Sequence, residues 1–329
     1  MGIIYFDKKP FITRIKIELI LISLIIYNIL YVAVNNNYNE TKIIKTAICT
    51  MGKRENLYVK EFIEYYINIG IDHIFIYDDN DPNEEQIYKA IDKKYQKNVT
   101  IYEAKKNNIY NQSIAFSECY NLHKNQFDWF LMLDMDEFLY IVDDTLKGYL
   151  TNKRFKKCDF IKLHWVIPTD NNMVYYDSRP LFVRFRPPYI KSEYVKSIIK
   201  GNISNLKYGI HSSYFSPERN ITCNNVGKRI YYKDMNIQNI RLKNIKKAYI
   251  IHFRYKSTEE FINKLKRGYS NWLSDDLKFV IEQIKIYFTI NNATPEKIKF
   301  IEKELKINIS HFIKDIYKLK FKKYKGIFL

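Results

Sequence analysis

Residues 130–140 read FLMLDMDEFLY, and this stretch decides the fold class. It begins as a continuously apolar run, breaks into the acidic tetrapeptide at 134–137, and then turns apolar again. Three carboxylates beside a core would repel one another and resist leaving water unless a cation or an exposed edge relieves them. The stretch therefore predicts a buried strand whose carboxyl end opens onto a site holding positive charge.

Strand and helix patterns alternate on the amino-terminal side of this stretch. Continuously apolar strands buried on both faces are typical of a parallel sheet covered by helices. The sequence therefore predicts an α/β fold with a mostly parallel sheet flanked by helices. We predict strands at 46–50, 73–77, 99–102 and 129–133, and helices at 55–69, 82–95 and 109–123.

One of these helices carries a start signal of its own. Asp81 would be the N-cap, Pro82 the first helical residue and Glu84 the capping-box partner of the helix at 82–95. Farther along, short strands are predicted at 160–165, 181–185, 195–199 and 249–253, and the chain reads helical from residue 257, with a further helix start at Thr294.

Acidic side chains follow two of the predicted strands. In open α/β sheets, ligands bind beyond the carboxyl ends of the strands. Asp134 and Asp136 are two residues apart, so on an extended chain they point the same way and can converge on one ion. Oxygen ligands of this kind select Mg²⁺ or Mn²⁺, which keep open positions for phosphate oxygens. The pattern suits an enzyme that binds a nucleotide diphosphate.

The net charge of +18 suggests an anionic partner. However, Lys, Ile, Asn and Tyr are abundant together, which indicates an AT-rich genome, and the lysines alternate with acidic residues. No nucleic-acid-binding motif accompanies them, so we expect no nucleic-acid partner.

The cysteines lack the spacing of a zinc site. Cys49, in a strand pattern, and Cys119, in a helix pattern, are interpreted as buried free thiols. A disulfide between Cys158 and Cys223 is left open.

Residues 15–34 are apolar over about the length that crosses a bilayer. Four basic residues lie in the segment 8–16, whereas NNNYN follows at 35–39, and this asymmetry predicts a cytoplasmic amino terminus. We therefore predict a single-pass type II membrane protein with a lumenal catalytic part, as in the Golgi or endoplasmic reticulum. A cleaved signal peptide and a buried helix are the alternatives.

The ordered set of motifs resembles glycosyltransferase family 92 and its bacterial family-2-like relatives with the GT-A fold. The resemblance runs from about residue 46 to 268. It includes EFIEYYINIGIDH at 61–73, IYDD at 76–79, Gln112, Cys119, LDMDEF at 133–138, Trp165, DNN at 170–172, KSII at 196–199, His211, HFRYKS at 252–257 and KLKRG at 264–268.

The resemblance implies an inverting transferase that uses a nucleotide sugar and a divalent cation, Mn²⁺ or Mg²⁺. Characterised relatives mostly move galactose from its uridine diphosphate, and the acceptor would be a glycan or glycoconjugate. Asp134 would face the ribose and the metal, and Asp136 would ligate the metal directly. His252 would complete the metal site, with His211 as the competing candidate.

Six residues would bind the donor nucleotide beside the metal: Thr50, Arg54, Asp78, Asp79, Gln112 and Lys256. Inversion also needs a general base for the acceptor hydroxyl. Asp170 would be that base, with Asp177 and Glu193 as rivals. The family's aromatic-glycine pair is replaced by residues 168–169, which puts the acceptor and the transferred sugar in doubt.

From the predicted membrane span and the family resemblance we predict five parts of the chain. They are a cytoplasmic tail at 1–14, a signal-anchor at 15–34, a stem at 35–44, a GT-A domain at 45–270 and a helical extension at 271–329. The alternatives are a phosphohydrolase of the haloacid dehalogenase type and a non-catalytic, membrane-anchored glycan-binding protein. The phosphohydrolase family normally places its Asp-x-Asp near the start of the domain. Here four predicted strands come before Asp134.

Overall fold

The computed structural model describes residues 26, 44–109, 111–204, 206, 221–230, 247–268, 277–310 and 313. The chain divides into two units between residues 43 and 44, and the elements below belong to the second. Apart from residue 26, the predicted membrane span at 15–34 lies outside the described residues, as does His211. Within the described ranges, no helix has the length and apolar character needed to cross a membrane.

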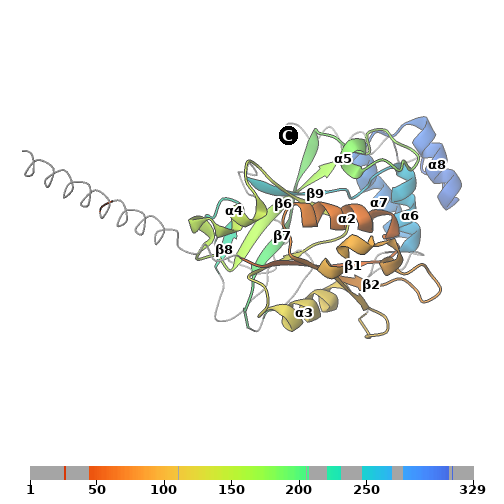
Figure 1. Ribbon diagram of the computed structural model, residues 1–329. Helices are drawn as coiled ribbons and strands as arrows, with labels where there is room; N and C mark the ends of the chain where they lie inside the picture. Colours follow the sequence, from red (N-terminus) through yellow and green to blue (C-terminus); the bar gives the residue numbers. More distant parts are fainter. Residues whose placement is uncertain are drawn as a thin grey trace, which may run out of the picture. The chain divides into compact units, whose positions relative to one another are not determined.

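The described residues contain a sheet in the order β3-β2-β1-β4-β7-β6-β9-β5, with β8 beside β6 (Figure 1). The first four strands are parallel, as predicted. β7 is antiparallel to β4, and β5 to β9, so the sheet is mixed. The strands are β1 (Thr46–Gly52), β2 (His73–Asp78), β3 (Val99–Glu103), β4 (Trp129–Met132), β5 (Glu137–Ile141), β6 (Phe160–Pro168), β7 (Tyr189–Lys200), β8 (Thr222–Asn224) and β9 (Ala248–His252).

Helices cover both faces of the sheet. They are α2 (Asn56–Asn68), α3 (Gln112–His123), α4 (Leu146–Thr151), α5 (Leu181–Arg184), α6 (Thr258–Arg267), α7 (Leu277–Ile290) and α8 (Pro295–Leu305). Alternation along β1 separates the two faces. Ile48 belongs to the core cluster that contains Phe62 of α2, whereas Ala47 belongs to the cluster that contains Phe116 of α3.

The predicted helix at 82–95 is wrong. The chain there forms two short 3₁₀ helices, Ile87–Ala90 and Lys93–Asn98. Side chains satisfy the backbone in place of a helical ladder, because the Asp78 carboxylate accepts from the Ile87 amide and the Gln86 side chain donates to the Asp81 carbonyl. Asp81 therefore caps no helix.

The strand predicted at 181–185 is also wrong, because this segment forms α5. The Leu181 amide donates to the Glu61 carboxylate of α2, which anchors the start of the short helix. A short apolar run does not by itself distinguish a strand from a helix. By contrast, the predicted start at Thr294 is confirmed, since its side chain accepts from the Lys297 amide at the start of α8.

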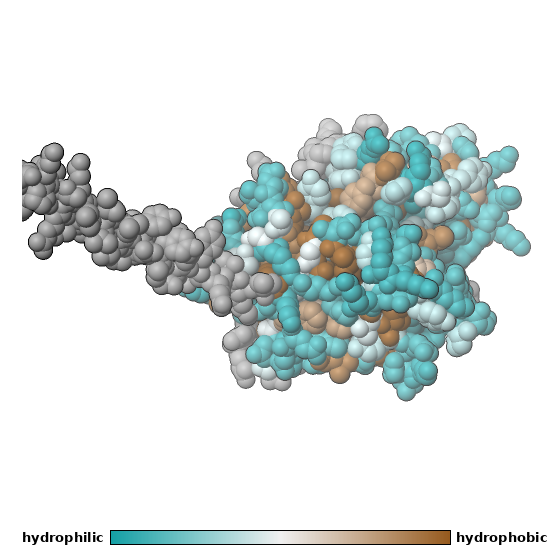
Figure 2. All heavy atoms as spheres, viewed as in Figure 1, coloured by the Kyte–Doolittle hydropathy of each residue, from teal (hydrophilic) through white to brown (hydrophobic). Residues whose placement is uncertain are grey.

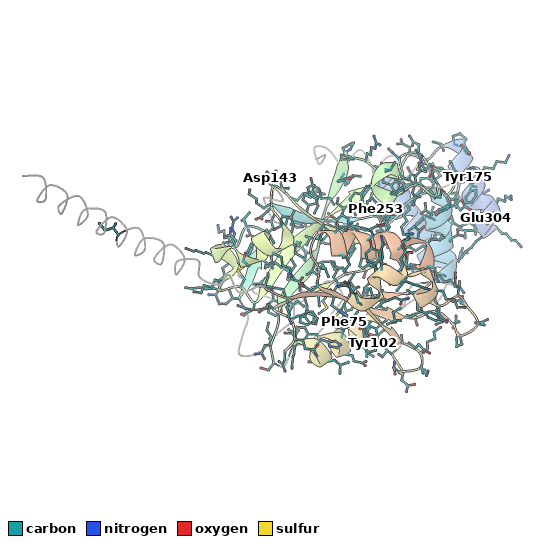
Figure 3. The ribbon with its side chains drawn as sticks, in the orientation of Figure 1. Phe75, Tyr102, Asp143, Tyr175, Phe253 and Glu304 are labelled. Carbon is teal, nitrogen blue, oxygen red and sulfur yellow. A yellow bond between two sulfur atoms is a disulfide. The ribbon has the colours of Figure 1, made fainter. Side chains whose placement is uncertain are left out.

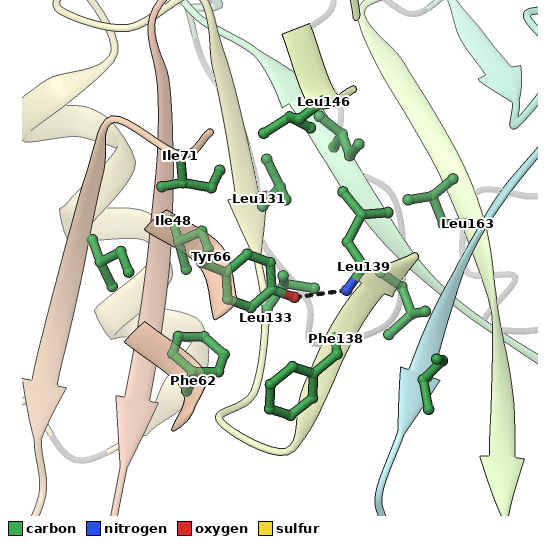
Figure 4. Close-up of a cluster of buried hydrophobic side chains, with 14 of the residues drawn as sticks. Ile48, Phe62, Tyr66, Ile71, Leu131, Leu133, Phe138, Leu139, Leu146 and Leu163 are labelled. Carbon is green, nitrogen blue, oxygen red and sulfur yellow. Dashed lines mark hydrogen bonds between the residues drawn. The ribbon is translucent and has the colours of Figure 1, made fainter. Parts of the chain in front are cut away.

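Helix α2 also holds β5 in place. This strand begins at the end of the acidic tetrapeptide 134–137, which we call the acidic turn. The Tyr66 hydroxyl accepts from the Leu139 amide at 2.9 Å (Figure 4). It also donates to the Glu137 carbonyl at 2.8 Å. Phe62 packs edge-on against Phe138. The start of β5, directly after Asp136, is thereby held by a buried side chain of α2.

The described cysteines form two disulfides, Cys49–Cys119 and Cys158–Cys223. The prediction of free thiols at Cys49 and Cys119 is wrong, because α3 covers the face of β1 on which Cys49 lies. Their Cα atoms are 6.1 Å apart, within the range that a disulfide spans. Disulfides are typical of oxidising compartments such as the secretory pathway.

Hydrophilic side chains cover most of the face drawn in Figure 2, with smaller apolar groups between them. Several lysines on the surface pair locally, as in Lys60 with Asp92 and Lys94 with Glu64. Exposed pairs of this kind contribute little to stability, because solvent screens the charges. These lysines belong to a solvated surface.

Lys162 is an exception, because it is buried in the middle of β6 and donates to the Ser197 hydroxyl. Burial lowers the pKa of Lys162 to about 7. Between this value and the ordinary lysine pKa, the unfolded chain binds a proton that the folded chain lacks, so the free energy of unfolding should rise with pH. We expect Lys162→Met to remove about 2–4 kcal/mol of the rise between about pH 7 and pH 10.

Urea unfolding of the wild type and the variant at both pH values measures this difference. Lys60→Met, at an exposed lysine, is the control and should keep the wild-type slope. An unchanged slope in Lys162→Met would mean that Lys162 stays charged when buried.

Candidate metal and nucleotide site

The acidic turn lies between two strands that the sheet places apart. β4 ends at Met132 and β5 begins at Glu137, so Asp134 and Asp136 occupy the connection. Glu137 lies directly opposite His252, the last residue of β9. One ligand atom from each of Asp134, Asp136 and His252 lies within 4.8 Å of the others. The structure thus brings together the three residues that we predicted as metal ligands.

Two lysines supply positive charge at this cluster. Lys196 Nζ, on β7, lies 3.1 Å from Asp134 Oδ1 and 3.2 Å from Glu137 Oε2. Lys264 Nζ, on α6, lies 2.7 Å from Asp136 Oδ2. The carboxylates are therefore balanced in part by the chain itself, and Asp134, with 27% of its side chain exposed, keeps the cluster open to solvent.

Protonation states in the cluster suit a cation. Burial lowers the pKa of His252 despite the opposing charge of Asp136, which favours the neutral imidazole that ligates metals. Burial alone would raise the pKa of Asp136, but Lys264 and then His252 outweigh it and hold that pKa well below its usual range. Burial and the charge of Asp134 raise the pKa of Glu137.

Aromatic packing fixes the histidine. The Trp165 ring lies edge-on to the His252 ring, with centroids 4.3 Å apart. The next residue, Phe253, labelled in Figure 3, packs against Phe138 and Phe182. Aromatic contacts thus hold the end of β9 at His252 itself and at the residue that follows it.

A second charged group joins α6 to the loop after β1. Arg267 Nη2 lies 2.6 Å from Glu55 Oε1, and Arg267 also donates to the Lys53 carbonyl at 2.6 Å. Lys256, a predicted donor-binding residue, lies 4.0 Å from Glu55 and 3.8 Å above the Tyr58 ring. Burial lowers the pKa of Lys256 against the pull of Glu55 and Asp136.

Two predicted donor-binding residues differ in their position: one lies beside the metal cluster and the other within a buried strand. Gln112, the first residue of α3, donates to Asp134 Oδ1. Thr50 lies in β1, and its buried hydroxyl has no hydrogen-bond partner among the described residues. Gln112 thus contacts a metal-ligand candidate, whereas Thr50 is fully buried within the sheet.

The other predicted residues divide by environment. Arg54 is half exposed and pairs with Glu84 at 2.5 Å. Asp78 is buried, and both of its oxygens accept backbone amides of the following loop, at 3.0 and 2.7 Å. Asp79 is half-buried, and burial raises its pKa. Asp78 thus shapes the loop, whereas Asp79 suits ligand contact better.

Asp170, the predicted general base, is buried away from solvent in a different network. Its carboxylate pairs with Lys297 of α8 at 2.5 Å and accepts from the Tyr287 hydroxyl of α7. Its other oxygen accepts from the Asn172 amide. These contacts suit a role in holding the turn after β6 against α7 and α8 better than the role of a base. Its rival Asp177 pairs with Arg179 at the surface.

No role was predicted from the sequence for Lys196 or Lys264. Lys196 lies inside the apolar run 195–199, which is predicted to be buried. A buried lysine needs a carboxylate partner, so its position could have indicated that it pairs with an acidic residue. Lys264 carries no comparable signal, since helical spacing does not tell which face of α6 meets Asp136.

The fold and the cluster define an α/β protein with two carboxylates and a histidine placed to hold a cation at the edge of its sheet. The chain belongs to glycosyltransferase family 92, whose family model matches residues 44–287. This membership favours a transferase over the haloacid dehalogenase alternative.

Two curated relatives carry the same family name. A glycosyltransferase family 92 protein of Oryza sativa subsp. japonica is 28% identical over 125 residues, covering 36% of this chain and 21% of the relative. One from Ricinus communis is 29% identical over 96 residues, covering 29% and 17%. The matched part thus spans about a fifth of the length of these relatives.

Among solved structures, a CMP:2-keto-3-deoxy-manno-octonic acid synthetase complexed with CTP matches at 13% identity with a TM-score of 0.25. The match covers 47% of this chain and 74% of that one.

Proposed function

We propose that this chain is a metal-dependent glycosyltransferase that moves a sugar from a nucleotide diphosphate to a hydroxyl group of a glycan. The observation that carries the proposal is the convergence of Asp134, Asp136 and His252 within 4.8 Å in a chain of family 92. Two carboxylates and a neutral imidazole suit Mn²⁺ or Mg²⁺.

Different residues around the cluster would bind the cation, the phosphates and the nucleoside of the donor. Asp134, Asp136 and His252 would hold the cation, which when bound would stabilise the charge developing on the leaving diphosphate. Arg267 and Lys256 offer positive charge to phosphate oxygens from the neighbouring group. Gln112 and Asp79 offer hydrogen bonds to the nucleoside.

The proposed reaction is a single displacement that inverts the anomeric carbon. The acceptor oxygen bonds to that carbon while the bond from the carbon to the diphosphate oxygen breaks, and the hydroxyl proton passes to a base. UDP-galactose is the first donor to test, from the family resemblance. The disulfides support a lumenal location, with residues 15–34 as the proposed anchor.

Donor hydrolysis tests this function without knowledge of the acceptor. The full-length chain is incubated with a panel of uridine and guanosine diphosphate sugars in Mn²⁺, and free sugar is measured. We expect slow release from one donor, lost in EDTA and restored by Mn²⁺ or Mg²⁺. Phosphate release from monoesters without sugar release would favour a phosphohydrolase, and donor binding without turnover would favour a non-catalytic protein.

A further inference from the structure

Lys264 and His252 contact different oxygens of the Asp136 carboxylate. Its Nζ lies 2.7 Å from Asp136 Oδ2, while His252 Nε2 lies 3.3 Å from Asp136 Oδ1. Both oxygens of this carboxylate are therefore engaged by the chain. A divalent ion bound to Asp136 would sit close to the lysine ammonium, and two cations at that distance repel each other.

The two lysines of the cluster differ in how firmly they are held. Lys196 lies within β7 with 2% of its side chain exposed, between the carboxylates of Asp134 and Glu137. Lys264 lies in the last turn of α6 with 17% of its side chain exposed. A lysine ammonium on a flexible, partly exposed stem can exchange one anionic partner for another, so of the two lysines Lys264 is the one better placed to move.

The diphosphate of a bound donor would give Lys264 a second anionic partner. Arg267, three residues farther along α6, pairs with Glu55 in the loop after β1, so this face of α6 carries a second cation near the metal-ligand cluster. A nucleotide diphosphate coordinated to an ion on Asp136 would bring phosphate oxygens beside Lys264.

We propose that Lys264 couples metal binding to donor binding. Without a nucleotide diphosphate, its ammonium competes with the divalent ion for Asp136. With one, Lys264 pairs with the phosphate oxygens and releases the carboxylate to the ion. The inference rests on the proposed function and adds to it a residue that makes ion and donor bind together.

Direct measurement of Mn²⁺ binding to the full-length chain tests this coupling. Free Mn²⁺ is followed by electron paramagnetic resonance with and without UDP, corrected for the Mn²⁺–UDP complex formed in buffer. In the wild type we expect UDP to tighten Mn²⁺ binding about tenfold or more. In Lys264→Met, Mn²⁺ alone should bind about tenfold more tightly, and the tightening by UDP should be about tenfold smaller than in the wild type, because only direct coordination of the ion by the phosphates remains.

Two further variants separate this mechanism from a general change in charge. Lys266→Met removes a lysine of the same helix that pairs with Glu304 at the surface, and it should behave like the wild type. Lys264→Arg keeps the cation and should keep the coupling. Circular dichroism and thermal melting confirm that each variant is folded.

The outcomes distinguish this inference from the proposed function. If Lys264→Met keeps the wild-type coupling, or gains Mn²⁺ affinity equally with and without UDP, the coupling role is overturned while the metal site stands. If the wild type binds no Mn²⁺ in either condition, or Asp136→Asn binds it as the wild type does, the proposed metal site fails and the inference fails with it.

Discussion

Replacing Asp136 with Asn should lower donor turnover by about a thousandfold and abolish Mn²⁺ binding. The amide keeps the size of the side chain but removes the charge that the ion needs, and Asp136 is the carboxylate whose low pKa keeps it ionised. The loss corresponds to about 4 kcal/mol of transition-state stabilisation. Donor hydrolysis at saturating Mn²⁺ and donor measures turnover.

The matched control is Asp92→Asn, because Asp92 pairs with Lys60 at the surface. It should retain wild-type turnover. Thermal melting of both variants shows whether a loss reflects unfolding, and Lys264, with 17% of its side chain exposed, can turn to solvent once its partner is neutral. Unchanged turnover in Asp136→Asn would end the metal role and the mechanism built on it.

The two aspartates of the metal-ligand cluster could be predicted because they lie two residues apart directly after an apolar strand. They were expected to converge on an extended chain, but the structure places them in the connection between β4 and β5, with Asp136 in a turn. His252 was predicted from the family resemblance, and its approach to the aspartates depends on the pairing of β9 with β5.

The cations of the site could not be predicted in this way. Lys264 meets Asp136 only because α6 packs back toward the acidic turn, and Arg267 meets Glu55 for the same reason. The disulfide between Cys49 and Cys119, 70 residues apart in sequence, likewise depends on which face of β1 is covered by α3. Periodicity shows that a face is buried without showing what covers it.

Local signals also failed where side chains competed for the backbone. Asp81, Pro82 and Glu84 form a plausible helix start, yet the Asp78 carboxylate and the Gln86 amide bind the backbone of this loop and hold it in another shape. Asx residues near a turn offer such contacts at little cost. The result is a loop beside β2, at the edge where a nucleotide would bind.

Arg184→Met should destabilise the protein by about 3–5 kcal/mol, because it leaves a buried carboxylate without its main partner. Arg184 Nη1 lies 2.8 Å from Glu260 Oε2, and their side chains are 2% and 5% exposed. Glu260 also accepts from the Tyr58 hydroxyl of α2 and closes the capping box with Ser257 at the start of α6. The pair thus joins three helices around the end of the molecule that carries Lys264.

The pH dependence of this loss identifies its cause. Burial would raise the pKa of Glu260, but the hydrogen bond from Arg184 and then those from Ser257 and Tyr58 hold it below the usual range. A depressed carboxyl pKa contributes stability above the unfolded pKa that is lost as pH falls through the folded one. Without the guanidinium that pKa should rise, so the difference in unfolding free energy should be larger at about pH 7 than at about pH 4.

Urea unfolding at these two pH values measures the effect, and Arg179→Met provides the comparison. Arg179 pairs with Asp177 while 62% of its side chain is exposed, so solvent screens the pair and its loss should leave the stability close to that of the wild type. Equal stability of the two variants would mean that Glu260 finds water or another donor when Arg184 is removed. In that case α5 would not be needed to hold α6 beside the acidic turn, and the position of Lys264 would depend on α6 and its cap alone.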